Sequence, residues 1–470
     1  MLKELRIRNF KGWQDTGLIR MAPITLLFGA NSSGKSSIGQ FLLMLKQTVE
    51  SPDRRTVFYP GGRTSPVQLG SYREMVFQRN PDNKISFQYR WALPEKLEVK
   101  DPVSQKTYFG DELSFQAKVG LDDGFRHTPT LDHLKYELRK KGATSESLSV
   151  GLNYEPEGEL RCEVATTGYS LKTKQDRLLQ PAAPVRFYGF PDEVVACYQN
   201  ADFVQDLNLQ HEIFFGRLRY LGPLRTRAER LYSWTGSEPE SVGFTGENTI
   251  AAILGARNRK ISLGDGRPAE PFEQVIATQL KRMGLIEDFD VSRIAEQRQE
   301  YEVRVQTKGA SYWVDLPDVG FGVSQVLPVL VECFYAPKDS IILMEQPEVH
   351  LHPSAQSALA DIMIDVMQSQ ENGEKRNIQL IIETHSEHFL RRLQRRIAEE
   401  KLQQEEVSVY FANLAQVPAT LEPLKLDPYG NILNWPENFF GDEMLDITEQ
   451  ARFAMKRRIE LAREKEEKPE

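Results

Sequence analysis

A glycine-rich segment near the start of the sequence carries residue types that bind phosphate. Residues 29–36 read Gly-Ala-Asn-Ser-Ser-Gly-Lys-Ser and fit the pattern G-x-x-x-x-G-K-[ST]. Such a loop curls its backbone N–H groups around a β-phosphate, while the lysine reaches the β- and γ-phosphates and the serine hydroxyl ligates Mg²⁺. Ser36 is therefore a candidate metal ligand. The candidate phosphate-binding residues are Gly29, Asn31, Ser32, Ser33, Gly34, Lys35, Ser36 and Ser37.

A second candidate phosphate-binding turn lies far along the chain. Gly322-Val-Ser324-Gln325 comes directly before an apolar stretch, residues 326–334, that is typical of a helix. A serine hydroxyl and backbone donors at a helix N-terminus can contact a γ-phosphate. Glycine-rich turns also begin helices for steric reasons alone, so this pattern counts only together with the residues that follow it.

Two glutamates and a histidine follow apolar strands in the same region. The strand predicted at 341–344 ends at Glu345, which we expect to hold the hydration shell of Mg²⁺. Glu348 is placed to orient or deprotonate an attacking water. A strand predicted at 379–384 leads to His385, which is expected to donate a hydrogen bond to a γ-phosphate. The catalytic candidates are thus Glu348 and His385, and the alternatives are surface carboxylates and a structural histidine.

Alternating strand and helix patterns predict the elements that position these residues. An apolar run at 24–28 precedes the glycine-rich loop, and apolar residues then recur at helical spacing from Ile38 to Leu45. Short alternating runs from about 84 to 190 indicate antiparallel strands. Dense apolar strands return after residue 310, so we expect the two ends of the chain to share one parallel sheet. The residues before Phe10 are interpreted as an edge strand.

The fold class expected from these patterns is α/β, with the chain divided into five units. Residues 1–83 and 310–415 form the two parts of one head. Residues 84–199 form a β-rich insertion, 200–309 a mixed α/β lobe, and 416–470 a C-terminal extension with a charged helical tail.

The order of these motifs resembles the ABC-type ATPases of the SMC and OLD group, whose P-loop head is split by a long insertion. The resemblance rests on the loop at 29–36, on Ser324-Gln325, on the Glu345 to Glu348 segment and on His385. It implies ATP and Mg²⁺ as cofactors and a homodimer, or a higher oligomer, in which Ser324 contacts the nucleotide of the opposite subunit. It also implies a role for Lys11 beside the nucleotide base and for Gln68 as a metal ligand.

Segments outside these motifs are similar to a bacterial subgroup that includes the ATPase subunits of the anti-phage systems Septu and PARIS. These are Tyr220 to Arg225, Asp427 to Asn431 and Asn434 to Phe440. The resemblance implies a separate effector partner, a nuclease or toxin, that is held or released according to nucleotide state. One departure is that Glu345 stands where transporter cassettes have aspartate, with Gln346 where many relatives have a second acid, which is expected to slow hydrolysis.

Composition limits the remaining possibilities. The chain has 59 Lys and Arg against 67 Asp and Glu, a formal net charge of −8, which excludes a uniformly basic nucleic-acid coat. No apolar run is long enough to span a bilayer, and three widely spaced cysteines argue against a disulfide framework, so a cytoplasmic protein without a membrane partner is expected.

Three other functions were weighed. OLD nucleases carry a Toprim domain with an Asp-x-Asp set, which the residues after His385 lack. Nuclease activity in this chain is therefore not expected, although Asp442 and Glu443 leave that alternative open. Arginines between 217 and 230 and between 391 and 396 leave DNA contact open, with the alternative that some of them reach across to a nucleotide, as finger residues do. An SMC-like DNA-repair clamp is the main alternative function. Lack of a coiled-coil pattern disfavours that clamp, and lack of a membrane segment disfavours a transporter cassette.

Overall fold

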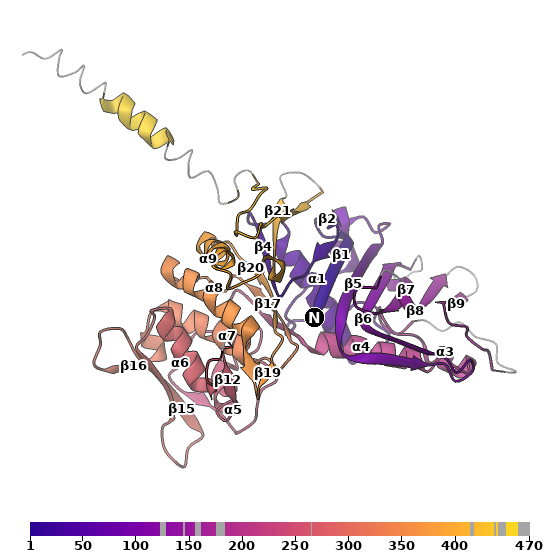
Figure 1. Ribbon diagram of the computed structural model, residues 1–470, viewed down its shortest axis with the longest axis horizontal. Helices are drawn as coiled ribbons and strands as arrows, with labels where there is room; N and C mark the ends of the chain where they lie inside the picture. The colour runs from indigo at the N-terminus through magenta and orange to yellow at the C-terminus, as the bar shows by residue number, and fades with distance from the viewer. Residues whose placement is uncertain are drawn as a thin grey trace, which may run out of the picture.

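A computed structural model describes residues 1–122, 128–143, 146–155, 161–174, 184–264, 266–413, 418–436, 439 and 448–458. The described chain forms two large sheets with helices around them (Figure 1). Asp442 and Glu443 lie outside the described residues, as do residues 437, 438 and 440 of the segment from Asn434 to Phe440.

The central sheet unites segments from both ends of the chain. Its order is β10-β17-β20-β4-β21-β22; the first five strands are parallel and β22 is antiparallel to β21. β4, which precedes the glycine-rich loop, thus lies between two strands that follow residue 378. The strands are β4 (Ile24–Gly29), β10 (Leu218–Leu221), β17 (Ile341–Glu345), β20 (Gln379–Glu383), β21 (Val407–Asn413) and β22 (Thr420–Leu424).

Helices and a second sheet cover the two faces of the central sheet, which explains why its inner strands are buried and mostly apolar. All six residues of β4 are buried. Leu26 packs in one hydrophobic cluster with residues of α5 to α9, and Leu27 packs in the other with residues of α1 and α4. The helices are α1 (Lys35–Glu50), α2 (Tyr72–Met75), α3 (Asp192–Cys197), α4 (Phe203–Gly216), α5 (Thr249–Gly255), α6 (Phe272–Arg282), α7 (Phe321–Tyr335), α8 (Pro353–Gln368) and α9 (Glu387–Ala398).

The second large sheet is antiparallel, with the order β2-β1-β5-β6-β7-β8-β9, and β3 also pairs with β1. The interpretation of the N-terminal segment as an edge strand is wrong, because β1 pairs with β2 and β3 on one side and with β5 on the other. The strands are β1 (Leu2–Phe10), β2 (Trp13–Asp15), β3 (Ile19–Arg20), β5 (Ile85–Lys100), β6 (Thr107–Leu121), β7 (Pro129–Arg139), β8 (Glu146–Glu155) and β9 (Arg161–Thr167).

Two small sheets complete the described part of the chain. One has the order β11-β15-β14 with β16 paired to β15, and the other has the order β13-β12-β18-β19. Their strands are β11 (Tyr232–Ser233), β12 (Lys260–Ser262), β13 (Glu270–Pro271), β14 (Asp288–Arg293), β15 (Glu300–Gln306), β16 (Trp313–Asp315), β18 (Gln370–Glu371) and β19 (Glu374–Lys375). Residues 448–458 are helical.

The expected α/β head, assembled from the two ends of the chain, is confirmed by the central sheet. The five domain boundaries remain a prediction. The sheets nevertheless cross two of these boundaries, since β1 of the first unit pairs with β5 of the second, and β10 of the third lies beside β17 of the fourth. Both crossings bring insertion residues next to the head.

Candidate active site

The glycine-rich loop connects buried β4 to the N-terminus of α1. Gly29 has φ 143° and Gly34 has φ 93°, conformations that residues with a Cβ adopt at a cost. Lys35 is 3% exposed, and its Nζ donates to the carbonyl oxygens of Gly29 at 2.8 Å and Ala30 at 2.7 Å. Burial lowers the pKa of this ammonium. The lysine therefore lies folded over the loop, where a phosphate would compete with two carbonyls for its protons.

The packing of Gly29 against β21 predicts that Gly29→Ala destabilises the fold. A Cβ at this position would lie 2.3 Å from the carbonyl oxygen of Ala412, and the positive φ adds strain. We expect the free energy of unfolding to fall by ~2–5 kcal/mol, which is the combined cost of overpacking and of backbone strain. Urea denaturation measures it, with Gly17→Ala as the control, because that glycine has positive φ but open space around it. Equal losses in the two variants would contradict the close approach to β21.

Trp13 and Lys11 brace the loop from the antiparallel sheet. The Trp13 Nε1 donates to Ser37 Oγ at 2.7 Å, and its ring lies against Gly34. Ser37 Oγ in turn donates to the Gly34 carbonyl at 2.5 Å. The Lys11 Nζ donates to Gln40 on α1. Trp13 was missed from the sequence, because only the pairing of β2 with β1 places it beside a loop that follows twenty residues later in the chain.

Three oxygen-bearing side chains converge at the carboxyl ends of β17 and β20 and the start of α1. Glu345 and Glu383 are register partners on adjacent strands, and Ser36 Oγ donates to Glu383 Oε1 at 3.0 Å. Burial and then the charge of Glu383 raise the pKa of Glu345 to about 7. Burial also raises the pKa of Glu383. A buried and a partly buried carboxylate on adjacent strands, with a hydroxyl beside them, match the oxygen ligands that Mg²⁺ prefers.

Glu383 was not selected from the sequence, although it ends the predicted strand that leads to His385. A glutamate at a strand end is usually exposed, and here the register of β20 against β17 buries it. The structure therefore adds Glu383 to the candidate metal ligands Ser36 and Glu345.

The raised pKa of Glu345 predicts how Glu345→Gln changes stability in metal-free buffer. A folded-state pKa of about 7, above the ordinary value for a glutamate, means that the folded protein binds this proton more tightly than the unfolded chain does. The resulting stability is present at low pH and is lost as the pH rises toward about 7. Glutamine carries no charge, so the variant should be more stable than wild type at pH ~8, by about 3 kcal/mol at most, and the gap should close near pH ~5.

Differential scanning fluorimetry with EDTA across this pH range measures the difference between the two proteins. Glu240→Gln is the control, because Glu240 lies on the surface in an ion pair with Arg219. A melting temperature of Glu345→Gln below that of wild type at pH ~8 would contradict a raised pKa of Glu345 in the folded protein.

Glu348 lies buried behind these carboxylates and is 6% exposed. Its Oε1 accepts from Thr384 Oγ1 at 2.7 Å and from the backbone N–H of His385 at 2.8 Å. Its Oε2 is buried and has no hydrogen-bond partner among the described residues. Burial raises the pKa of Glu348, with the hydrogen bonds and Arg225 acting in the opposite direction. One oxygen is thus anchored, and the other is left as an acceptor, as a general base requires.

The edge strand β10 and the loop after it contribute two more side chains. The Tyr220 hydroxyl donates to Glu345 Oε1 at 2.9 Å. Arg225 is 8% exposed, and its Nη2 donates to the carbonyls of Glu345 at 3.2 Å and Gln346 at 3.3 Å. Burial lowers the pKa of Arg225 to about 10. Both residues lie in a segment that the sequence marked as a subgroup resemblance, and Arg225 was also one of the arginines considered for DNA contact. The pairing of β10 with β17 brings them to the site.

The other predicted site residues lie apart from this cluster or take part only through their backbone. His385 contributes its backbone N–H to Glu348. Its side chain lies at the surface, and partial desolvation lowers the pKa of the ring. Gln68 is exposed, and its amide donates to the carbonyl of Arg63. Asn31 and Ser32 are exposed at the tip of the loop, and Ser33 is buried beneath it. The roles of His385 and Gln68 remain predictions.

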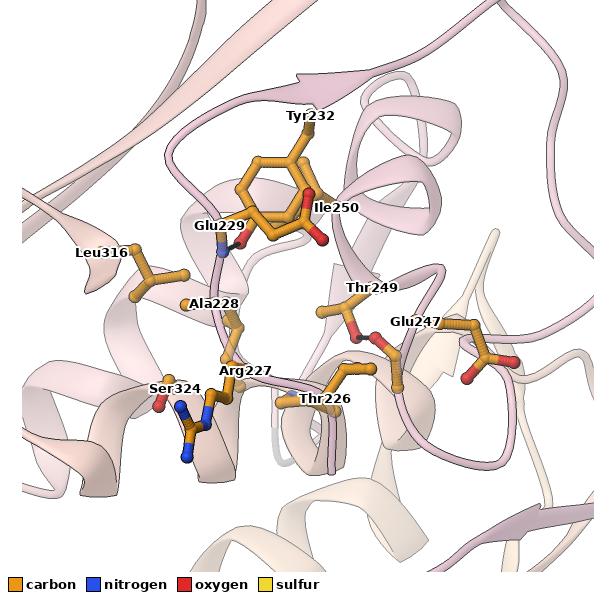
Figure 2. Close-up of a pocket in the computed structure, with 13 residues that line it drawn as sticks. Thr226, Arg227, Ala228, Glu229, Tyr232, Glu247, Thr249, Ile250, Leu316 and Ser324 are labelled. Carbon is orange, nitrogen blue, oxygen red and sulfur yellow. Dashed lines mark hydrogen bonds between the residues drawn. The ribbon is translucent and has the colours of Figure 1, made fainter. Parts of the chain in front are cut away.

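The predicted Ser324 turn belongs to the first turns of α7, and Gly322, Ser324 and Gln325 are all inside that helix. Ser324 Oγ donates to the Phe321 carbonyl at 3.0 Å, and Gln325 is buried. Among the described residues, no hydrogen bond joins Ser324 to the glycine-rich loop, Glu345 or Glu348. Ser324 instead lines a cavity of about 120 Å³ with the loop after β10 and the start of α5 (Figure 2).

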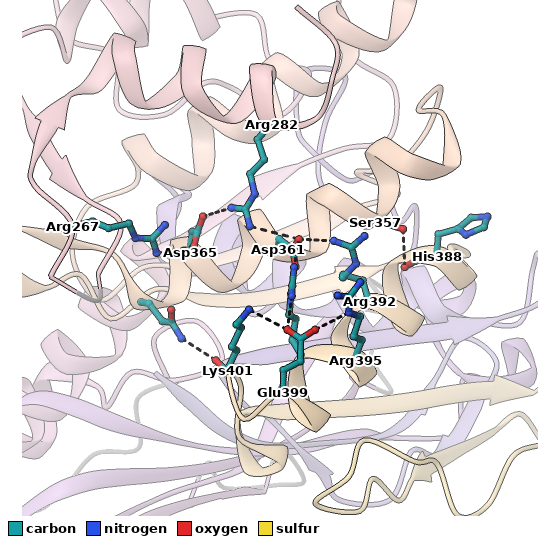
Figure 3. A network of polar contacts seen from close by, with 12 residues as sticks. Arg267, Arg282, Ser357, Asp361, Asp365, His388, Arg392, Arg395, Glu399 and Lys401 are labelled. Atoms are coloured by element: carbon teal, nitrogen blue, oxygen red, sulfur yellow. Dashed lines mark hydrogen bonds and ion pairs between the residues drawn. The ribbon is translucent and has the colours of Figure 1, made fainter.

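Most of the arginines that left DNA contact open are paired with acids. On α9, Arg392 and Arg396 both contact the buried Asp361, at 2.6 Å each (Figure 3). Arg395 pairs with Glu399 and Arg391 with Glu387. These pairs neutralise the basic side of the helix, so it offers little net charge to a phosphate backbone.

Comparison with protein families identifies part of the chain. Residues 256–391 match a family described as AAA domain, putative AbiEii toxin, Type IV TA system, and residues 402–450 match a protein family of unknown function (DUF3696). The first match includes Ser324, Glu345, Glu348 and His385. The chain therefore carries an AAA-type ATPase domain. No curated protein sequence matches the chain.

Solved structures of SMC heads are similar to most of the chain. The SMC head domain from Thermotoga maritima has a TM-score of 0.39 at 10% identity over 90% of this chain and 99% of its own. The SmcHead bound to the C-winged helix domain of ScpA has a TM-score of 0.40 at 10% identity over 90% of this chain and 98% of its own. An Smc head with an extended coiled coil, bound to the C-terminal domain of ScpA derived from Pyrococcus furiosus, has a TM-score of 0.38 at 10% identity over 96% and 99%.

These TM-scores lie below 0.5. Within the described part of the chain, no helix has the length and apolar character needed to cross a membrane.

Proposed function

We propose that the chain hydrolyses ATP with Mg²⁺ in a site completed by a second copy of itself, and that nucleotide state decides whether an effector protein is held or released. One observation supports ATP hydrolysis. The glycine-rich loop, the Glu345–Glu383 pair and Glu348, whose Oε2 has no hydrogen-bond partner among the described residues, meet at one edge of the sheet. Nucleotides bind at the carboxyl ends of parallel strands, where these residues lie.

The residues divide the work of phosphoryl transfer among them. Lys35 and the N–H groups at the start of α1 would hold the phosphates. Ser36, Glu345 and Glu383 would hold the metal, which would supply positive charge to offset that of the phosphates. Glu348 would accept the proton of the attacking water at Oε2. The new water–phosphorus bond then forms as the bond to the β,γ-bridging oxygen breaks, and ADP leaves with that electron pair.

The position of Ser324 supports a site shared between two copies. Ser324 begins α7 on an open surface and contacts its own phosphate loop through no hydrogen bond in the described chain, so a phosphate that it contacts would belong to another molecule. The positive end of the α7 dipole would add to this contact. A symmetric dimer would place two such serines over two phosphate loops.

The biological setting that we propose is bacterial anti-phage defence, with an effector that is a nuclease or toxin. The support is the family description of residues 256–391, which names a putative toxin of a toxin–antitoxin system, together with the sequence resemblance to Septu and PARIS subunits. The cytoplasm remains the proposed location. The ion pairs on α9 count against the alternative of a DNA clamp.

Association driven by ATP tests the shared site. In a background that binds but does not turn over ATP, Glu348→Gln, light scattering is expected to show dimers with ATP and Mg²⁺ and monomers without them. Adding Ser324→Arg should abolish the dimers, because a long cation would fill the space of the opposite γ-phosphate. Ser357→Arg, at a partly buried position of α8 comparable to that of Ser324, is the matched control. Dimers that persist in the Ser324→Arg protein would remove Ser324 from the interface.

A further inference from the structure

The loop after β10 contains an arginine that differs from its neighbours in having no acidic partner. Arg217 pairs with Asp339, Arg219 with Glu240, and Arg230 with both Asp315 and Asp318. Arg225 is buried at Glu345. Arg227 is exposed, and no ion pair or hydrogen bond of its side chain is present in the described part of the chain. The guanidinium of Arg227 therefore has free N–H donors that an anionic group of another molecule could accept from.

The position of Arg227 indicates where that anion would come from. Arg227 and Ser324 line the same cavity, and Figure 2 shows the guanidinium and the serine hydroxyl on the same side of it. Arg225, two residues earlier, turns the other way and reaches the Glu345–Gln346 backbone of its own site. Two arginines of one short loop thus point in different directions. Arg225 contacts the active site of its own chain, and Arg227 lies beside Ser324.

Exposed apolar side chains flank the same surface. Leu224 is 82% exposed and precedes the arginines, while Phe321 is 57% exposed on the first turn of α7. The Phe321 ring lies 5.6 Å from that of His350, on the loop that follows Glu348. Large apolar groups around an unpaired cation are typical of the buried centre of a protein interface.

We propose that Arg227 acts in trans, donating a bidentate hydrogen bond to the γ-phosphate held by the glycine-rich loop of a second copy. This inference rests on the shared site proposed above. The guanidinium would stabilise the negative charge that builds on the equatorial oxygens as the γ-phosphoryl group transfers, which is the role of an arginine finger. Ser324 and Arg227 would then approach the same phosphate together, which couples turnover to dimer formation.

Single variants measure the size of the effect. Arg227→Ala is expected to lower kcat by on the order of 10³-fold, as loss of an arginine finger does. Nucleotide affinity of the monomer and the melting temperature should not change, since the side chain is exposed and unpaired. Arg227→Lys should keep part of the activity. Arg230→Ala, an exposed arginine of the same loop, is the matched control and should keep wild-type turnover.

Mixing two inactive variants decides between action in trans and in cis. Arg227→Ala and Glu348→Gln are combined without nucleotide so that the chains exchange, and ATP turnover is then measured. A heterodimer has one site with both an intact Glu348 and an intact Arg227 from its partner. Activity should recover to about one quarter of the wild-type rate for random pairing in a two-fold dimer. Lys35→Ala mixed with Glu348→Gln should not recover, because both residues serve their own chain's nucleotide.

The outcomes separate this inference from the proposed function. No recovery in the first mixture, while Glu348→Gln still forms dimers with ATP, overturns the role of Arg227 in trans and leaves the dimer standing. Wild-type turnover in Arg227→Ala alone overturns it too. Failure of Glu348→Gln to associate with ATP counts against the shared site itself, and with it against any contact in trans.

Discussion

Glu348→Gln is expected to slow ATP turnover by about 10²- to 10⁴-fold, the usual contribution of a general base, and to leave ATP affinity close to that of wild type. The amide fills the space of the carboxylate. Its oxygen can still accept from Thr384 Oγ1 and from the His385 N–H, which now hold Oε1 at 2.7 and 2.8 Å. The amide nitrogen that replaces Oε2 cannot take a proton from water, so binding and chemistry should separate.

Turnover and fluorescent-nucleotide binding, measured on the same preparation, test this expectation. Glu240→Gln is a suitable control, since Glu240 lies on the surface in an ion pair with Arg219. A fall in affinity that matches the fall in turnover would mean that Glu348 contributes to nucleotide binding or to folding. Another residue would then have to act as the general base.

Lys35→Ala is expected to weaken ATP binding on the order of 10²-fold or more, because charge-assisted hydrogen bonds to phosphate contribute roughly 1.5–3 kcal/mol each. In the structure the Lys35 ammonium donates to two carbonyl oxygens of the loop, at 2.7 and 2.8 Å, and so stabilises the conformation of the loop. The variant loses these two bonds as well. Its melting temperature should nevertheless fall only slightly, because a single loop is affected.

Isothermal titration with ATP and thermal melting together measure the two effects. Lys46→Ala controls for the loss of a lysine from the same helix, since Lys46 pairs with Glu50 in the last turns of α1. Unchanged affinity in Lys35→Ala would remove the phosphate-loop assignment. A large drop in melting temperature would instead give Lys35 a structural role in the fold.

Local sequence patterns predicted the parts of the site that depend on neighbours in the chain. The loop at 29–36 and the helix that follows it are set by glycines and by apolar spacing over a few residues, and the structure has β4, the loop and α1 in that order. The strands that end at Glu345 and Glu383 were also predicted to within a residue or two. Backbone conformation and burial of a short apolar strand are local properties, so the sequence shows them directly.

Contacts between distant segments were missed or misread. Trp13, Tyr220, Arg225 and Glu383 join the site only because β2 pairs with β1, β10 with β17, and β17 with β20. Nothing in the residues around Arg225 distinguishes it from the paired surface arginines nearby. The N-terminal strand was misread for the same reason, since its partners β3 and β5 lie on opposite sides and the second is reached only after a long excursion.

The sequence by itself thus determined that this protein has a glycine-rich loop between a buried strand and a helix, an α/β head assembled from both ends of the chain and acidic residues at strand ends. Only the tertiary structure decided that Glu345 and Glu383 oppose each other beside Ser36, that Glu348 keeps one oxygen unpartnered, and that Arg225 and Arg227 face different ways. The physical reason is that pairing of strands and burial of charge depend on register and packing between segments far apart in the chain, which no local pattern encodes.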